Sequence, residues 1–160
     1  MEVPDVFLDE TVRRSTFNLR ATYARTANAL ARAGQTEKAI EVLNTATTKM
    51  PVSKLGYDYF SLGLIEGYYV AGDAESAKAM AEGFKTDIVQ RLEYFAQFKG
   101  KQARQVRSEV EANMQYLQML ARMNLQYTVG MALTQEAYQA DPMVQLYEKY
   151  AQQFGIQQQQ

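Results

Sequence analysis

Neither cysteine nor histidine occurs among the 160 residues of the chain. Without cysteine there is no disulfide framework and no thiol nucleophile, although a helical domain of this size needs no disulfide in any compartment. Without histidine the chain lacks the most common general base and the most common metal ligand. A metal site would need oxygen ligands alone, and the sequence has neither an acidic calcium-binding loop nor a glycine-rich phosphate loop. We therefore expect no cofactor and no structural metal.

Neither sign of charge is in large excess, and long apolar runs are missing. Lysine and arginine together number 17 against 18 acidic residues, and the two signs are interspersed. Nucleic-acid-binding domains usually carry a basic patch or stripe, so we expect no nucleic-acid partner.

No segment approaches the roughly 18 uninterrupted apolar residues of a membrane span, and the opening residues lack the features of a signal peptide. We therefore expect this chain, taken alone, to be soluble.

Proline is scarce, with only three residues, at positions 4, 51 and 142. The long intervals between the prolines are rich in alanine, glutamine, leucine, methionine and glutamate, which favour helices, and they lack the alternating pattern of strands. Apolar residues recur instead at spacings of three to four. The sequence therefore predicts an all-α fold, with helices over about residues 9–33, 36–50, 58–71, 74–99, 101–127 and 142–154.

The most informative feature of the sequence is a repeat. Residues 33–39 (AGQTEKA) are echoed 38 positions later by residues 71–77 (AGDAESA). In each copy a helix ends in Ala-Gly, a polar turn follows, and a second helix begins. We expect Gly34 and Gly72 to adopt the left-handed conformation that ends a helix. The alanine that closes each copy is small enough for the second helix to pack closely on the first.

The first copy resembles the tetratricopeptide repeat (TPR) at Ala27, Gly34, Ala39, Ala46 and Pro51. The second copy departs from that pattern because Val89 stands where a closing proline is expected. The resemblance implies one TPR-like domain over residues 1–155, built as a right-handed superhelix of about six helices. Its parts are repeat one at about 19–51, repeat two at about 57–89, and long C-terminal helices at about 101–154. Residues 156–160 would form a disordered glutamine-rich tail.

Acidic residues fall in pairs at three places, and paired carboxylates are the usual basis of acid–base catalysis. The pairs are Asp9 with Glu10, Asp73 with Glu75, and Glu109 with Glu111. Residues one or two apart on a helix do not face each other, and acidic residues at a helix start stabilise its positive end. We therefore interpret Asp9, Asp73 and also Asp141 as helix caps, and expect no catalytic residue.

A second likeness extends over about residues 5–85 and is carried by short motifs. These are VFLDET at 6–11, RR at 13–14, NLR at 18–20, YAR at 23–25, MP at 50–51, YDYF at 57–60 and EGYY at 66–69. Together they resemble the C-terminal soluble region of large bacterial multi-pass membrane proteins that are similar to protein O-mannosyltransferases. Residues 104–155 match no family in this way.

This second resemblance implies that the chain is part of a membrane-embedded glycosyltransferase-like protein and lies on its extracytoplasmic (periplasmic) side. The catalytic machinery of such proteins lies in their membrane part, so no catalytic residue carries over to this chain. The resemblance therefore implies a non-enzymatic domain that is membrane-associated through its parent.

On the TPR pattern, five residues would line the concave face of the repeats: Asn28, Arg32, Tyr59, Glu66 and Tyr69. Tyrosine, arginine and asparagine are effective recognition residues, so the pattern predicts a groove for a peptide or protein partner. Alternatively, these tyrosines are half-buried packing residues whose hydroxyl groups reach water. A second hypothesis for the function is a structural domain that braces its parent or forms a homodimer. The surface for a dimer would be the adaptable methionines of the fifth helix, Met114, Met119, Met123 and Met131.

Two clusters of basic residues complete the predictions. Lys99, Lys101, Arg104 and Arg107 flank Gly100. They would form either a solvated helix corner or a surface near phospholipid headgroups. At the other end of the chain, we expect four arginines to pair with nearby acids and hold the N-terminal segment. The arginines are Arg13, Arg14, Arg20 and Arg25, and the acids are Asp5, Asp9 and Glu10.

Overall fold

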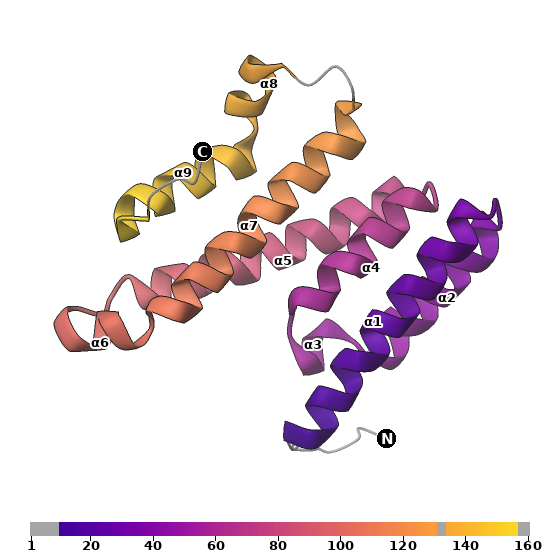
Figure 1. The fold of residues 1–160 in the computed structure, drawn as a ribbon, viewed down its shortest axis with the longest axis horizontal. Helices are drawn as coiled ribbons and strands as arrows, with labels where there is room; N and C mark the ends of the chain where they lie inside the picture. The colour runs from indigo at the N-terminus through magenta and orange to yellow at the C-terminus, as the bar shows by residue number, and fades with distance from the viewer. Residues whose placement is uncertain (1–9, 131–133, 157–160) are drawn as a thin grey trace. The chain divides into compact units, whose positions relative to one another are not determined.

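The computed structural model describes residues 10–130 and 134–156, and Figure 1 shows their arrangement. Over these ranges the chain forms nine α-helices and no strand, which confirms the all-α prediction. The helices are α1 (Glu10–Arg32), α2 (Thr36–Lys49), α3 (Val52–Leu55), α4 (Tyr59–Val70), α5 (Ala74–Phe95), α6 (Gly100–Gln105), α7 (Arg107–Thr128), α8 (Gln135–Ala140) and α9 (Pro142–Phe154).

The chain forms two compact units, residues 1–77 and 78–160, and the boundary between them falls inside α5. The first unit contains α1 to α4 and the start of α5. The second contains the rest of α5 and α6 to α9. Our expectation of a single domain over residues 1–155 stays a prediction. The expected glutamine-rich tail lies, apart from Ile156, outside the described residues, and so does the expected cap Asp9.

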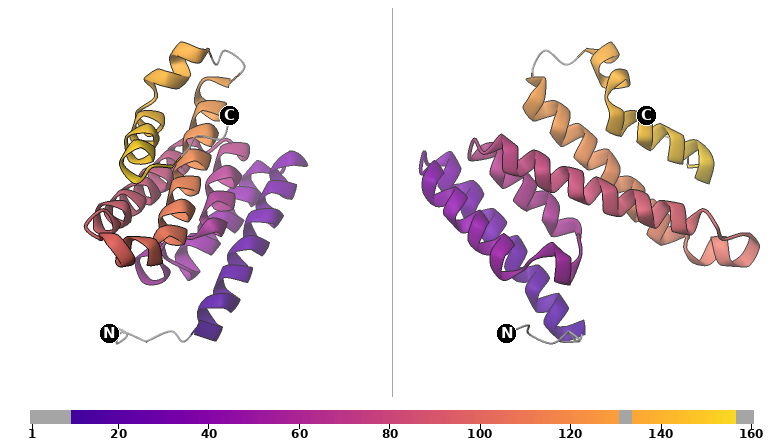
Figure 2. Two further views of the ribbon diagram at one scale, coloured as in Figure 1. Left: turned by 60° about the vertical axis from the view of Figure 1, so that its left-hand side comes forward. Right: turned by 180° about the vertical axis from the view of Figure 1, so that it is seen from behind.

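In the first unit α1 packs against both α2 and α4, and Figure 2 shows the three helices side by side from two directions. The buried stripe of α2 consists of Ala39, Leu43 and Ala46, each wholly inaccessible to solvent. Small residues also bring α1 close to α4, because a Cβ atom built on Gly63 would lie 3.2 Å from the Cβ atom of Ala24. Alanine and glycine therefore set the short separations between these helices, as we expected for Ala39.

The two turns of the repeat have the same geometry. Gly34 has a φ angle of 77° and Gly72 one of 85°, so both adopt the left-handed conformation. In the first turn the backbone N–H groups of Gly34 and Gln35 donate to carbonyls three and five residues earlier, at 3.0 and 2.9 Å. The N–H groups of Gly72 and Asp73 make the same two bonds at 3.0 and 2.9 Å. This is the Schellman arrangement that closes a helix with glycine, and it confirms the predicted role of both glycines.

Three short helices were not predicted, and the number of helices therefore exceeds the expected six. Helices α3, α6 and α8 have four to six residues each. Segments of this length are too short to show a 3.6-residue apolar period, so the sequence pattern does not reveal them. Gly100 does interrupt the chain, with a φ angle of 57°, but it also begins α6.

In the second unit α7 packs against α9, and α8 contacts α9. The expected restart at Asp141 is confirmed, because its Oδ1 atom accepts hydrogen bonds from the backbone N–H groups of Met143 and Val144 at 2.8 and 3.1 Å. The methionines of α7 that we expected to form a dimer surface are not all exposed. Met114 is 2% exposed and lies in the core, contrary to our expectation, and Met131 lies outside the described residues.

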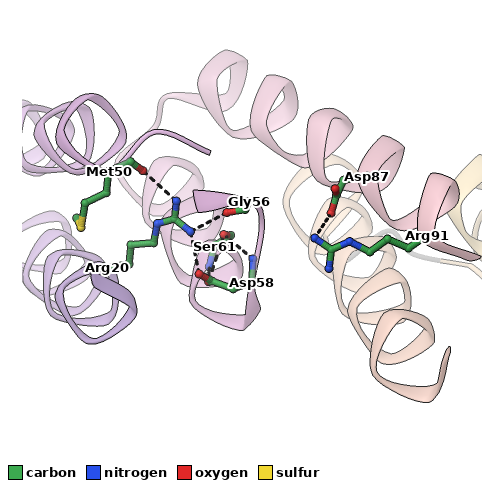
Figure 3. A network of polar contacts seen from close by, with 7 residues as sticks. All are labelled: Arg20, Met50, Gly56, Asp58, Ser61, Asp87 and Arg91. Carbon is green, nitrogen blue, oxygen red and sulfur yellow. Dashed lines mark hydrogen bonds and ion pairs between the residues drawn. The ribbon is translucent and has the colours of Figure 1, made fainter. Parts of the chain in front are cut away.

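Arg20 is the largest fully buried side chain in the described structure, with no exposed area. Its Nη1 atom donates to the carbonyl of Gly56 at 2.9 Å and to Asp58 Oδ2 at 2.8 Å, and its Nη2 atom donates to the carbonyl of Met50 at 2.9 Å. Figure 3 shows these bonds converging from α1 on the connection between α2 and α4. The guanidinium thus holds three points of one connection, and its fork of donors suits that role.

The expected pairing of the N-terminal arginines is therefore wrong for Arg20, whose acidic partner is Asp58. A partner close in sequence was the wrong choice because the buried side chain reaches across the fold. Arg25 Nη2 lies 3.4 Å from Thr22 Oγ1, so its described bond is within its own helix. The remaining side chains of that expectation lie outside the described part of the structure: Asp5, Asp9, Glu10, Arg13 and Arg14.

Candidate functional site

The candidate groove residues lie on two neighbouring helices, Asn28 and Arg32 on α1 and the other three on α4. The two helices run in the same direction, because Gly63 is opposite Ala24 and Gly67 is opposite Asn28. Residues on α4 are thus level with residues about 39 positions earlier on α1. This register places Glu66 and Tyr69 near the level of Asn28 and Arg32. Tyr59 lies two helical turns away from Glu66, about 10 Å along the axis.

The five side chains differ in exposure. Arg32 and Tyr59 are exposed, Tyr59 to 53%, and Asn28 and Glu66 are partly exposed. Tyr69 is only 8% exposed, and burial raises the pKa of its hydroxyl group. The expectation that all five side chains are at least partly open is therefore wrong for Tyr69.

The burial of Tyr69 has a physical origin in α4 itself. Seven of its twelve residues are buried, and they lie on more than one side of the helix. A helix that is apolar nearly all round has no single polar face, so its register cannot be assigned from periodicity. The segment FSLGLIEGYYV at residues 60–70 is the sequence signal from which this burial could have been predicted.

Asn28 is held by its own helix. Its Nδ2 atom donates to the carbonyl of Ala24 at 3.0 Å, and a Cβ atom on Gly67 would lie 3.7 Å from the same Nδ2 atom. Its Oδ1 atom is buried and has no hydrogen-bond partner in the described structure. A buried carbonyl oxygen without a donor costs free energy, and burial also closes this acceptor to a bound segment.

A polar cluster between α2 and α4 was not predicted. The Tyr68 hydroxyl donates to Asn44 Oδ1 at 2.9 Å and lies 3.4 Å from Thr47 Oγ1. Burial raises the pKa of this hydroxyl, and the hydrogen bond with Thr47 opposes the change. Tyr68 is 4% exposed, as expected for a core position. The cluster therefore joins two helices of the first unit and does not offer a reactive group.

A shallow hollow of about 480 Å³ lies on the outer face of α2. Its described lining comes from this one helix and consists of Glu37, Ile40, Glu41, Asn44, Thr45, Thr48 and Lys49. These residues share one helix face because they are spaced three, four and seven apart. The mixed charges and open shape do not identify a ligand.

The acidic pairs take structural roles where the structure describes them. Asp73 Oδ1 accepts from the backbone N–H of Ser76 at 3.1 Å, so Asp73 is the predicted cap. Glu109 accepts from Ser108 Oγ, and Glu111 forms an ion pair with Arg107. Among residues 10–130 and 134–156, no three acidic side chains gather closely enough to hold a metal ion.

Two further findings bear on the expectations of partner and location. Of the helices that the structure describes, none is long and apolar enough to cross a membrane. Comparison with protein-family models, with curated proteins and with solved structures gave no match to this chain. The resemblance to membrane glycosyltransferase-like proteins therefore stays a prediction from sequence motifs.

Proposed function

We propose that the chain is a non-catalytic interaction module, and that the face formed by α1 and α4 binds a peptide or protein segment. The observation that carries this proposal is the relation between these helices. They run in the same direction in close contact, and each is closed by the same glycine turn 38 residues apart. This is the relation expected between the first helices of two successive helical repeats.

The contacts of the first unit support a TPR-like arrangement. Helix α1 packs against α2, its partner in the hairpin, and against α4, the first helix of the next hairpin. The consensus positions Ala27, Ala39 and Ala46 are all fully buried. In TPR proteins each repeat adds one helix to a continuous wall, and extended segments bind along that wall.

The chemistry of the face suits a polypeptide. Tyr59 supplies an exposed aromatic ring, and Arg32 and Glu66 supply charges of opposite sign. The distance from Tyr59 to the level of Arg32 is about twelve helical residues, or about 18 Å, which corresponds to about five residues of extended chain. Such a segment could contact the aromatic ring at one end and the charges at the other.

The location proposed for this module follows from the motif resemblance alone. We propose a parent protein that resembles membrane glycosyltransferases, with the module on its periplasmic side. Neither a nucleic acid nor a cofactor forms part of this proposal. The absence of histidine and cysteine supports a non-enzymatic role.

One observation favours the second candidate, a domain that braces its parent or forms a homodimer. Tyr69 is buried, so one of the five residues assigned to recognition serves packing instead. A bracing domain needs no open groove. The two candidates differ in whether exposed residues of α1 and α4 contribute binding energy.

A display selection of random peptides against the full chain tests the proposal. Selected peptides are synthesised and their affinities are measured by calorimetry. Tyr59→Ala and Arg32→Ala should each weaken binding at least about tenfold, because central aromatic and arginine contacts dominate peptide interfaces. Tyr94→Ala and Arg122→Ala remove residues of the second unit that are likewise exposed, and they should leave affinity unchanged. Peptides that bind all four variants equally, together with a dimer in sedimentation equilibrium, would support the bracing domain instead.

A further inference from the structure

The end of α5 carries a group of aromatic side chains that the proposed groove does not use. The ring of Tyr94 lies edge-on to that of Phe98, with centroids 5.1 Å apart, and 5.8 Å from that of Phe95. Phe95 and Phe98 are partly exposed, and Tyr94 is 57% exposed. In the described structure the only other large apolar side chains so exposed are Leu19 and Tyr59.

Cations follow these rings directly. Lys99, Lys101 and Arg104 are all exposed, and none of the three forms an ion pair with the residues that the structure describes. Lys101 and Arg104 are three apart on α6 and so share one side of it. Arg107 differs, because its Nε atom pairs with Glu111 at 2.7 Å and its Nη1 atom donates to the carbonyl of Phe154 at 2.8 Å.

Charge is therefore segregated along a chain that is nearly neutral overall. Residues 94–108 contain four of the 17 cationic residues and none of the 18 acidic residues. The rest of the chain is correspondingly acidic. In Figure 1 this stretch forms the connection between α5 and α7 in the second unit and includes α6. We call residues 94–104, with their exposed rings and three unpaired cations, the aromatic-basic turn.

We propose that the aromatic-basic turn docks on the surface of a bilayer that contains anionic phospholipid. Unpaired lysine and arginine side chains are attracted to such a surface, and tyrosine and phenylalanine rings settle at the boundary between headgroups and hydrocarbon. The contact is peripheral, with the rings at headgroup depth. It concerns the second unit and does not depend on the groove of the first.

The aromatic rings distinguish a lipid surface from an acidic polypeptide. Both would satisfy the three cations. The bilayer also offers an apolar boundary for Tyr94 and for the exposed edges of Phe95 and Phe98, which a purely acidic polypeptide does not. The three cations sit on a short helix and its cap, which places them and the rings in one stretch of eleven residues.

Vesicle binding by the full chain tests the charge component. Co-sedimentation is measured with vesicles of phosphatidylcholine alone and of phosphatidylcholine mixed with phosphatidylglycerol. The chain should bind the mixed vesicles and not the neutral ones. Each cation near an anionic surface contributes roughly fivefold in partitioning, so K99Q/K101Q/R104Q should lose about a hundredfold. The matched control K49Q/K54Q/K78Q removes the same charge from exposed positions elsewhere and should retain binding.

Fluorescence tests the aromatic component. The chain has no tryptophan, so Tyr94→Trp introduces a single reporter in the aromatic-basic turn. Its emission should shift to shorter wavelength when mixed vesicles are added, because the indole enters a less polar layer. Tyr59→Trp places the same reporter at a position of similar exposure, 53% against 57%, and its emission should not change. Circular dichroism confirms that each variant keeps the helical content of the parent chain.

Three results would overturn the proposal. The first is no binding to mixed vesicles at low salt. The second is equal loss of binding in the two triple variants, which would show an effect of net charge alone. The third is binding to poly-glutamate, dependent on Lys99, Lys101 and Arg104, without binding to vesicles. That result would identify an acidic polypeptide as the partner of this turn.

Discussion

Arg20 Nη1 lies 2.8 Å from Asp58 Oδ2, and this contact joins α1 to the residue that caps α4. The other carboxylate oxygen of Asp58 accepts from the backbone N–H of Ser61 at 2.9 Å, while Ser61 Oγ accepts from the backbone N–H of Asp58 at 3.1 Å. Asp58 therefore completes a reciprocal cap and neutralises a buried cation at once. Figure 3 shows both sets of bonds meeting at this residue.

Replacement of Arg20 should have the largest effect on stability of the changes considered. Arg20→Met leaves Asp58 without its cation and leaves the carbonyls of Met50 and Gly56 without this donor. Loss of one partner from a buried ion pair costs about 3–5 kcal/mol. We expect the free energy of unfolding in urea to fall by that amount.

Arg20→Lys provides a sharper comparison, because it keeps the charge and removes the fork. One ammonium group cannot reach the three acceptors with the same geometry, so we expect an intermediate loss of stability. Arg25→Met, on the exposed side of the same helix, should change the free energy of unfolding by less than about 0.5 kcal/mol. Equal stability of Arg20→Met and Arg25→Met would contradict the assigned role of the buried guanidinium.

The alanines of the repeat give a second prediction. Ala39 and Ala77 are both fully buried. Ala39→Leu and Ala77→Leu should each destabilise by roughly 1–3 kcal/mol, because a larger side chain overpacks a close contact. Ala29→Leu, at an exposed position of α1, is the control for helix propensity. Thermal unfolding measures all three, and unchanged melting of both buried variants would disprove the proposed packing.

Asp87 gives a prediction for pH. Burial raises the pKa of its carboxyl group. Arg91, whose Nη2 atom lies 2.7 Å from Asp87 Oδ2, opposes this rise only in part. With a raised pKa the folded state holds this proton more tightly than the unfolded state. The contribution of Asp87 to stability therefore falls as the pH rises from the unfolded value of 3.8 through the folded pKa, and the full penalty applies at neutral pH.

Asp87→Asn should consequently be at least as stable as the parent chain at pH 7. The stability advantage of Asp87→Asn should shrink as the pH falls through the folded pKa toward 3.8, because the carboxyl group of the parent chain then becomes neutral like the amide. Urea unfolding of both chains at several pH values measures the difference. Glu82→Gln removes an exposed carboxylate from the same helix and gives the baseline. An advantage of Asp87→Asn that grows on acidification would refute the sign of this effect.

The cap of α9 gives the last prediction. Asp141 is 8% exposed and accepts from two backbone N–H groups. Asp141→Ala should cost about 1–2 kcal/mol and should increase amide hydrogen exchange at the start of α9. Thr134→Ala removes the cap of the six-residue, exposed α8 and should cost less. If the two losses are equal, burial of the cap has no part in its strength.

Local signals predicted much of the fold. The glycine turns at Gly34 and Gly72 and the caps at Asp73 and Asp141 depend on residues within five positions, and all four predictions were confirmed. The partner of Arg20 could not be found in this way, because it lies 38 residues along the chain and the choice depends on packing.

The candidate site shows the same division. Two pairs of residues at helical spacing, on α1 and α4, were placed on neighbouring helices as expected. The exposure of each one depends on what covers it, and α4 is covered on several sides, so Tyr69 was misassigned. Periodicity identifies a face only where a helix has a single buried side.

The bonds of Arg20 also constrain the order of events during synthesis. The acceptors on Met50, Gly56 and Asp58 leave the ribosome 30, 36 and 38 residues after Arg20 itself. Because a chain is made from its N-terminus, α1 is made before any of the three acceptors that Arg20 binds in the folded structure. The three bonds of Arg20 can therefore all form only after residue 58 has been made, although α2, against which α1 also packs, is complete earlier.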